Sequence, residues 1–302
     1  MPAVSRPASV SVRAAFPTAL ASAIPGAIAM VAGVRAGGNV LIAGVSTTGM
    51  IDDAEAVFFD IGGVLVDLAS VRKGHRRFVA ELAGEHDLDE RDVLDTWREV
   101  IGNYFSERRG TEFRSAAEGY RRAVDAAVGT EVPESEWRPT FERASNETIR
   151  PVDGARETID RLSGEVYLGV ISDIDTREAE RILERFEVTD RFDAVTTSET
   201  VGRTKPDPAM FAAAIGEAGV SPSRSAMIGD RYHNDMRGGS WAGLHTIAFG
   251  GSAANGPESD RNDPEAGVGD ADRDGRDPDG VVDYRVTDLR DVPAIVGLDG
   301  PE

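Results

Sequence analysis

Short apolar runs alternate with amphipathic segments along most of the chain after residue 54. The apolar runs have the length of buried strands, and they occupy residues 56–60, 166–172, 192–198, 225–230 and 244–249. Between them, apolar residues recur at helical spacing in 154–162, 177–186, 208–218 and 234–242. Strands that alternate with helices predict a parallel sheet covered by helices on both faces. The sequence therefore predicts an α/β fold with a Rossmann-like parallel sheet.

Residues 68–150 interrupt this alternation with helical patterns only. Apolar and aromatic residues recur there at helical spacing, namely Val93, Leu94, Trp97, Val100, Ile101, Tyr104 and Phe105. Asp89 is placed to cap this helix, and Ser115 with Glu118 has the spacing of a capping box for the next one. We interpret the aromatic stripe as a core. An all-helical insert after the first strand predicts a cap domain that covers the strand ends.

This insert divides the predicted core into residues 50–67 and 151–302, and two stretches of unusual composition accompany that core. Residues 1–49 contain three Arg but no Asp or Glu. We expect them to be poorly ordered and outside the catalytic fold, either as a mis-assigned start that precedes the true Met50, as a targeting segment, or as a disordered tail. Residues 251–280 hold nine acids, three Arg, six Gly and no aromatic residue, which predicts an acidic disordered loop.

The charge of the chain excludes some partners. The formal net charge is -20, with 53 acidic and 33 basic residues, of which only Lys73 and Lys205 are lysines. We expect no nucleic-acid partner, because phosphate backbones are bound by basic surfaces. The apolar run 17–33 contains Pro25 and Gly26 and is too short for a membrane span, so no membrane partner is expected. The acid excess is typical of a salt-adapted cytoplasmic protein, since salt screens self-repulsion, although an ordinary acidic protein is the alternative.

Four short motifs stand at the ends of predicted strands or in the loops between them. They are F-F-D-I-G-G-V-L with Asp60, V-I-S-D with Ser172, G-R-T-K-P-D with Lys205, and I-G-D-R-Y-H-N-D with Asp230 and Asp235. In parallel sheets, sites form at the carboxyl ends of the strands. In this order, with a helical insert after the first, the motifs resemble those of the haloacid dehalogenase (HAD) superfamily of hydrolases, subfamily I type with a helical cap. The similarity covers roughly residues 55–250 and 281–296.

The resemblance implies a phosphatase-type hydrolase that acts on a small phosphorylated metabolite. Asp60 would be the nucleophile, and it would form an aspartyl phosphate that water then cleaves. The implied cofactor is Mg²⁺, a hard cation that prefers oxygen ligands, and the chain has no Cys to offer a thiolate. Its implied ligands are Asp60, the backbone carbonyl of Gly62, Asp230 and, directly or through water, Asp235.

The same resemblance assigns the groups that hold the phosphate. Ser172 would donate a hydrogen bond to a phosphate oxygen, and Lys205 would pair with both the phosphate and Asp60. Gly63 is implied as a further substrate-binding position. The chain contains very few lysines, but one of them lies in this loop, where a compact ammonium fits better than a planar guanidinium. We therefore expect Asp60, Ser172 and Lys205 to act together in catalysis.

Gly62 departs from the family's pattern. Phosphatases of this family usually carry a second Asp at this position, which protonates the leaving oxygen, and general acid catalysis is worth about 10² to 10⁴ in rate. Three hypotheses follow: a phosphatase whose leaving group needs little help, a metal- and phosphate-binding protein with weak or no turnover, and a 2-haloacid dehalogenase. In the dehalogenase branch of the family, the first motif resembles D-x-Y-G-T and the pair of metal-binding acids is absent. Because this chain has neither feature, the sequence disfavours a dehalogenase.

A few further residues near the motifs have no assigned role. His75, His233 and Asp67 are candidates for a substitute acid, but each is equally explained as a packing or turn residue. Residues 72–77 include a basic cluster in an acidic protein, Arg72, Lys73, His75, Arg76 and Arg77. This cluster either meets an anionic substrate or forms a solvated helix face.

Overall fold

The computed structural model describes residues 40–42, 45–47, 49–256, 277 and 279–298. Its main sheet has six parallel strands in the order β5-β4-β3-β6-β7-β8. The strands are β3 (Ala56–Phe59), β4 (Tyr167–Ser172), β5 (Ala194–Thr197), β6 (Ser225–Gly229), β7 (His245–Phe249) and β8 (Tyr284–Val286). The first five lie where the sequence predicts them. The sheet and the helical insert confirm the predicted fold class, a Rossmann-like α/β core with an all-helical cap.

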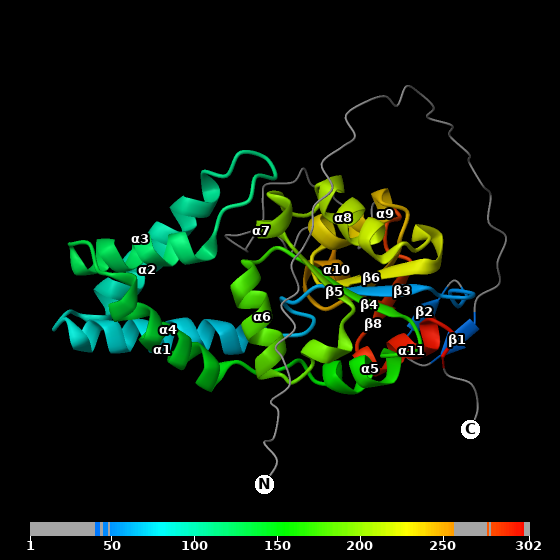
Figure 1. The fold of residues 1–302 in the computed structure, drawn as a ribbon, viewed down its shortest axis with the longest axis horizontal. Helices are drawn as coiled ribbons and strands as arrows, with labels where there is room; N and C mark the ends of the chain where they lie inside the picture. The colour runs from blue at the N-terminus through cyan, green and yellow to red at the C-terminus, as the bar shows by residue number, and fades with distance from the viewer. Residues whose placement is uncertain (1–39, 43–44, 48, 257–276, 278, 299–302) are drawn as a thin grey trace, which may run out of the picture. The chain divides into compact units, whose positions relative to one another are not determined.

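Helices cover both faces of this sheet (Figure 1). The core helices are α5 (Ala155–Leu162), α6 (Thr176–Arg185), α7 (Ser198–Val201), α8 (Pro208–Ala218), α9 (Gly238–Trp241), α10 (Gly251–Asn255) and α11 (Val292–Ile295). Short 3-10 turns lie at Thr189–Arg191, Pro222–Arg224 and Leu289–Asp291, and a π-helix, η3, spans Tyr232–Arg237. In Figure 1, α8 and α9 lie on one side of the strands, and α5 and α11 lie on the other.

The central strand β3 shows why the sheet needs both layers. Ala56 and Phe58 pack with residues of α8, whereas Val57 and Phe59 belong to the cluster that includes α5, α6 and α11. Side chains of a strand alternate between its two faces, so a strand buried on both faces is apolar at every position. All four residues are buried, and the apolar run then stops at Asp60 because the strand ends there.

The cap consists of four helices, α1 (Leu68–Glu85), α2 (Glu90–Ser106), α3 (Ala116–Val128) and α4 (Glu134–Thr148). Asp89 caps α2 as predicted, because its carboxylate accepts from the backbone N–H groups of Arg91 and Asp92. The predicted capping box of α3 is only half formed. Ser115 accepts from the Glu118 N–H, but the Glu118 carboxylate pairs with arginines of its own helix instead of returning to the backbone.

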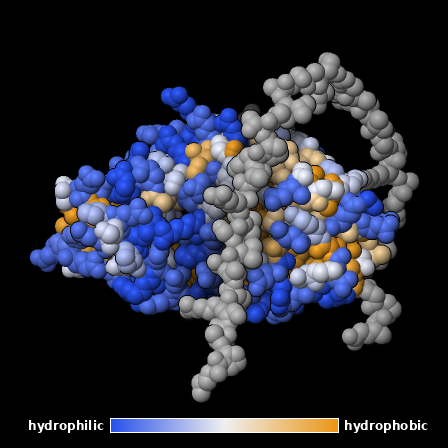
Figure 2. Space-filling model, viewed as in Figure 1, coloured by the Kyte–Doolittle hydropathy of each residue, from blue (hydrophilic) through white to orange (hydrophobic). Residues whose placement is uncertain are grey.

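The cap has its own hydrophobic core, which is separate from the core of the sheet. Trp97 of the predicted aromatic stripe is buried with Phe78, Trp137 and Phe141, as the core interpretation requires. Other residues of the stripe, Leu94, Ile101 and Phe105, line a cavity together with Trp97, so that interpretation is confirmed only in part. Tyr104 is also buried. Hydrophilic residues predominate on the visible outer face of the cap (Figure 2). The apolar side chains of these helices therefore face one another and, as described below, a cavity.

Two stretches differ from the sequence interpretation where the structure describes them. Most of the N-terminal stretch 1–49 lies outside the described residues, but β1 (Val40–Ile42) and β2 (Val45–Thr47) pair as a two-stranded antiparallel sheet. Residues 251–255, which the sequence assigns to a disordered loop, form α10. Its Ala253 N–H donates to Asp230 O at 2.9 Å, and its Ser252 Oγ accepts from Tyr232 N at 2.8 Å. These tertiary bonds stabilise a helix that is too short to be recognised from its own sequence.

Residues 257–276 and 278, the remainder of that predicted loop apart from Gly256, Asp277, Asp279 and Gly280, lie outside the described residues. Among the described helices, none is long and apolar enough to cross a membrane.

Candidate active site

Asp60 lies at the centre of the sheet edge, directly after β3. Its backbone N–H still donates to Ile228 O of β6 at 3.0 Å, so the sheet ladder fixes its position. Its Oδ1 accepts from the Ile61 N–H at 2.8 Å. After it, the chain turns at once, since Leu65 N and Val66 N both donate to Ile61 O. This turn leaves the carboxylate at the carboxyl edge of the sheet with only 6% of the residue exposed.

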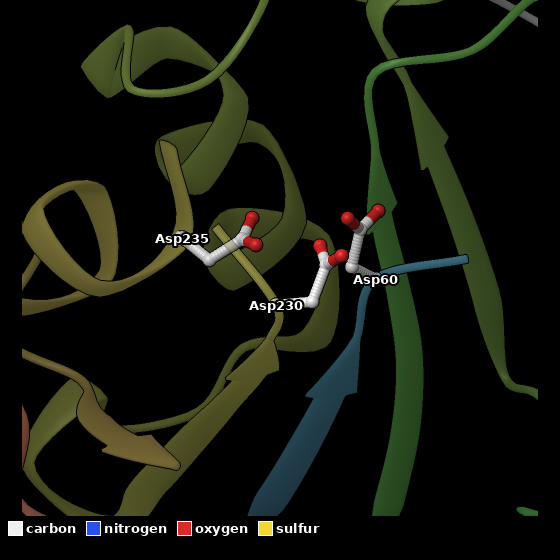
Figure 3. Close-up of side chains that lie close together, drawn as sticks. All are labelled: Asp60, Asp230 and Asp235. Carbon is white, nitrogen blue, oxygen red and sulfur yellow. The ribbon is translucent and has the colours of Figure 1, made fainter. Parts of the chain in front are cut away.

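Two further carboxylates converge on Asp60. One oxygen from each of Asp60, Asp230 and Asp235 lies within 4.8 Å of the others, and all three residues are buried. Figure 3 shows that Asp60 follows β3 and Asp230 follows β6, while Asp235 reaches the same space from η3. The wide turn of a π-helix is uncommon and occurs mostly at functional sites. The sequence prediction placed these three residues together, and the structure brings them together.

Lys205 is the cation that the structure shows in this cluster. Its Nζ lies 2.6 Å from Asp235 Oδ1 and 3.1 Å from Asp60 Oδ1, and it donates to Ile171 O at 2.9 Å. Burial alone would lower the pKa of Lys205, but the nearby Asp235, Asp60 and Asp173 carboxylates outweigh it and raise that pKa above its usual value. The ammonium is therefore charged over the whole physiological range.

One ammonium does not balance the carboxylates. Burial, followed by the charges of Asp235 and Asp60, raises the pKa of Asp230 to about 8. Burial and the Asp60 charge also raise the pKa of Asp235, against the opposing effect of Lys205. Ionised carboxylates at this spacing are unfavourable without a further cation. Hard oxygen donors gathered in this way fit a divalent cation such as Mg²⁺.

The two glycines after Asp60 play different parts in this arrangement. Gly63 has a φ of +72°, and a Cβ at this position would lie 2.6 Å from Asp230 Cγ and overlap the carboxylate. Gly62 has no such constraint, since an added Cβ would meet only Leu68 Cδ2, at the ordinary contact distance of 3.6 Å. The chain needs glycine at position 63, whereas position 62 has room for a side chain that it lacks.

Asp173 is a residue of the site that the sequence reasoning missed. Its Oδ1 accepts from the Lys205 N–H at 2.7 Å, and its Oδ2 accepts from Asn234 Nδ2 at 3.0 Å. It therefore ties the loop of Lys205 to the segment that carries Asp235. Burial raises the pKa of Asp173, although Lys205 opposes this. In the sequence, its position directly after Ser172 in V-I-S-D indicated that it lies near the site, but the fold is needed to show which loops it joins.

The candidate acids named from the sequence are placed in three different environments. Asp67 is the N-cap of α1, where its carboxylate accepts from Ala69 N and Ser70 N. His233 lies on η3 with its Nδ1 3.4 Å from Arg237 Nη1. His75 lies in the cap, where its ring packs against those of Tyr120 and Phe141. Of the three, only His75 lines the cavity described next.

A cavity of about 650 Å³ lies between the strand ends and the cap. Its floor includes Asp60, Gly62, Ser172 and Asp230, and its cap side is formed by aromatic rings and arginines. Ser172 is the last residue of β4 and only 3% exposed. The volume is that of a small-molecule site. Asp60, Asp230 and Ser172 thus line one cavity with residues of the cap, whereas Lys205 and Asp235 are outside its lining and are connected to Asp60 through the ion pairs of Lys205.

Comparisons with known proteins agree with this geometry. The model of a hydrolase family, described as haloacid dehalogenase-like hydrolase, matches residues 54–243. A glyceraldehyde 3-phosphate phosphatase of Pyrococcus furiosus is 29% identical over 203 residues, which cover 65% of this chain and 80% of that protein. A ribulose-1,5-bisphosphate 5-phosphatase of Halopiger xanaduensis is 26% identical over 207 residues, which cover 65% of this chain and 84% of that protein.

A solved structure shares the fold. The structure of a HAD phosphatase from Thermococcus onnurineus has a TM-score of 0.56 at 18% identity, and the match covers 81% of this chain and 99% of that one.

Proposed function

We propose that this chain, which belongs to the haloacid dehalogenase-like hydrolase family, is a Mg²⁺-dependent phosphatase of small phosphorylated metabolites. The observation that carries the proposal is the cluster of three buried carboxylates with Lys205, of which Asp60 and Asp230 line the floor of one cavity. The phosphatase names of the relatives from Pyrococcus furiosus and Halopiger xanaduensis support the same reaction class.

In the proposed first step, a carboxylate oxygen of Asp60 attacks phosphorus, and the bond between phosphorus and the ester oxygen breaks. The leaving oxygen takes its proton from water, because position 62 offers no acid. In the second step water attacks the aspartyl phosphate, so that orthophosphate leaves and the Asp60 carboxylate is restored. A divalent cation bound by Asp60, Asp230, Asp235 and the Gly62 carbonyl would neutralise the charge of the phosphate and hold it beside Asp60.

The other groups of the floor bind and orient the phosphate. The Lys205 ammonium is held charged by its neighbours and would pair with a phosphate oxygen as well as with Asp60. Ser172 would donate its hydroxyl proton to a second oxygen, and Gly63 allows the backbone to pass close to Asp230. The missing acid favours substrates with good leaving groups, such as anomeric sugar phosphates or acyl phosphates.

The test is phosphate release from a panel of phosphorylated metabolites, with Mg²⁺, with a chelator, and in the Asp60→Asn variant. We expect release that requires the metal and falls at least about 10³-fold in the variant, because a neutral amide is a poor nucleophile. Wild-type protein quenched in acid should carry label from a ³²P substrate, and hydroxylamine should remove it.

Release that persists in Asp60→Asn would exclude this residue as the nucleophile. A folded wild-type protein that binds Mg²⁺ but releases no phosphate from any substrate would instead favour the metal- and phosphate-binding protein that Gly62 first suggested. Halide release from a 2-haloacid would favour the dehalogenase, which the pair Asp230 and Asp235 argues against.

A further inference from the structure

Among the described residues, nine arginines line the cavity; one of them, Arg231, directly follows Asp230, and the other eight fall into two groups. Most of them have a carboxylate partner among the described residues: Arg98 with Asp95, Arg114 with Glu107, Arg138 with Glu134 and Glu142, Arg177 with Glu142, and Arg181 with Glu178. Arg72, Arg76 and Arg108 also line the cavity but have no carboxylate partner in the part of the chain that the structure describes. In a chain with 53 acidic residues, an unpaired arginine in a cavity is unusual.

Arg108 is the most confined of these three. It follows α2 in the segment that leads to α3, and its guanidinium lies over the ring of Phe105 at 5.6 Å. Its Nη1 makes one long hydrogen bond, of 3.5 Å, to Thr204 Oγ1. Its Nε is buried and has no hydrogen-bond partner among the described residues. Burying a charged hydrogen-bond donor without an acceptor costs free energy. An anionic group in the cavity would supply the acceptor that this guanidinium lacks.

The segment around Arg108 is fixed to the core. Thr204 N donates to Thr111 O at 2.8 Å, and Phe113 N donates to Gly202 O at 3.2 Å. Thr111 Oγ1 also donates to Asp207 Oδ2 at 2.6 Å. The guanidinium is thus held at a set place relative to the loop of Lys205, which binds the nucleophile. A group fixed in this way can select among substrates rather than only attract anions.

Arg108 is not needed for the phosphate that is cleaved. That phosphate has Lys205, Ser172 and the metal cluster, all of which come from core loops at the strand ends. Arg108, Arg72 and Arg76 come from the cap, the last two one turn apart on α1. Aromatic rings of the cap, including Trp97 and Tyr120, line the same cavity. At the core end the lining has the Asp60 and Asp230 carboxylates with Arg231, whereas Arg72, Arg76 and Arg108 of the cap have no carboxylate partner among the described residues.

We propose that Arg108, assisted by Arg72 and Arg76, binds a second anionic group of the substrate, either a carboxylate or a second phosphate. The substrate class is then small metabolites that carry this group in addition to the phosphate that is hydrolysed. Guanidinium groups bind both kinds of anion through paired N–H donors. This proposal rests on the proposed phosphatase function, because it takes the core end of the cavity as the place of the cleaved phosphate.

The experiment compares pairs of compounds that differ in one group. Glycerol 3-phosphate and 3-phosphoglycerate differ by a hydroxymethyl against a carboxylate, and ribulose 5-phosphate and ribulose 1,5-bisphosphate differ by a hydroxyl against a second phosphate. Each compound is measured as a competitive inhibitor of p-nitrophenyl phosphate hydrolysis, so that its own leaving group does not affect the result. We expect the member with two anionic groups to bind about tenfold more tightly in at least one pair, and the two pairs distinguish carboxylate from phosphate.

The variant Arg108→Met keeps the packing of the stem but removes the charge. This variant should no longer bind the member with the second anionic group more tightly than its partner compound. Its affinity for the member with a single phosphate should stay within about twofold of the wild-type value. The matched control is Arg109→Met, which removes the neighbouring arginine, a solvent-exposed residue outside the cavity lining. It should retain the preference.

Equal binding of both members of every pair by the wild-type protein would overturn the proposal. So would an Arg108→Met variant that weakens both members alike, since Arg108 would then serve the cleaved phosphate or the fold of the cap. If the wild-type protein hydrolyses neither p-nitrophenyl phosphate nor any metabolite of the panel, the proposed function fails separately. Calorimetric titration with the same pairs then decides whether the second-anion site exists.

Discussion

The core side of the cavity, its floor, and the cap side, its roof, differ in how their charged side chains are paired. On the floor, Asp60, Lys205, Asp230 and Asp235 are each at most 7% exposed, and they contact one another directly or through the lysine. On the roof, arginines and aromatic rings come from cap helices, and Arg72 and Arg76 are exposed to solvent as well as lining the cavity. The charged groups of the floor lie close to one another around Lys205, whereas three arginines of the roof have no carboxylate partner among the described residues.

This difference separates the reaction from the choice of substrate. Asp60 and Asp230 follow directly on strand ends, and Lys205 forms ion pairs with Asp60 and Asp235, so the sheet sets the positions of the floor and a shift of one residue disturbs the others. The roof residues lie on helix faces and one connecting segment, where single side chains can be exchanged without moving the backbone. We therefore expect substitutions on the floor to act on every substrate, and substitutions on the roof to act on particular ones.

The largest effect should come from Gly63→Ala, a substitution of one methyl group on the floor. The new Cβ would overlap the Asp230 carboxylate, and the φ of +72° is unfavourable for alanine. We expect kcat/KM to fall by about 10³ on every substrate, because a displacement of 1 Å at a reacting centre costs about 10² and the metal site is disturbed as well. Steady-state kinetics and Mg²⁺ titration measure both effects.

The neighbouring substitution Gly62→Ala is the matched control for this prediction. Its Cβ meets only Leu68 Cδ2 at 3.6 Å, so activity should stay within about threefold of wild type. Two variants that behave alike would contradict the different roles given to the two glycines. A Gly63→Ala protein that loses activity on one substrate only would contradict the division between floor and roof.

The sequence predicted the floor better than the roof, for a physical reason. Strand ends can be located from apolar runs, and each of Asp60, Ser172 and Asp230 follows or ends such a run. Asp173 was missed because its role depends on which loops lie side by side, namely those of Lys205 and Asn234. Arg108 was missed because the sequence shows neither which arginines find a carboxylate nor which line a cavity.

The same reasoning applies to the fold. The sheet and the cap were predicted because their patterns repeat over many residues. The short helix α10 was not, since it depends on bonds to Asp230 and Tyr232 rather than on its own sequence. Similarly, the capping box of α3 fails because Arg121 and Arg122 compete for the Glu118 carboxylate.

A smaller effect, in the direction of gain, is expected from Gly62→Asp. The position lines the cavity and has room for a side chain, so an acid placed there could protonate the leaving oxygen. We expect kcat to rise by up to about 10² for alkyl phosphates, the lower end of what general acids supply, with little change for p-nitrophenyl phosphate, whose leaving group needs no proton. The ratio of the two rates is the measurement.

Gly62→Asn tests whether a gain at this position comes from the acid. It adds a side chain of nearly the same size without a transferable proton, so it should not raise the alkyl phosphate rate. An equal gain in both variants would mean that position 62 acts by shape. No gain in Gly62→Asp, with Mg²⁺ binding intact, would mean that the leaving oxygen lies out of its reach.

The smallest effect concerns His75, and it tests how the roof maintains its charge. Burial, followed by the charge of Arg181, lowers the pKa of His75 from 6.5 to about 4, so the ring is neutral at physiological pH. The unfolded chain therefore takes up a proton at this residue between pH 6.5 and 4 that the folded chain does not. Since the unfolded state binds more protons in this window, the contribution of His75 to the free energy of unfolding falls as the pH decreases through it.

We expect this contribution to change by about 1 to 3 kcal/mol between pH 7 and pH 4, a range that allows for partial exposure of the ring to the cavity. Denaturant unfolding of wild-type protein and His75→Gln at both pH values, at one salt concentration, measures it as the difference between the two pH dependences. His86→Gln, at the exposed end of the same helix, controls for the loss of a histidine. Identical pH dependences in wild type and His75→Gln would show that the folded and unfolded states bind the His75 proton alike, and below pH 6.5 the positive charge of the roof would then not come from arginines alone.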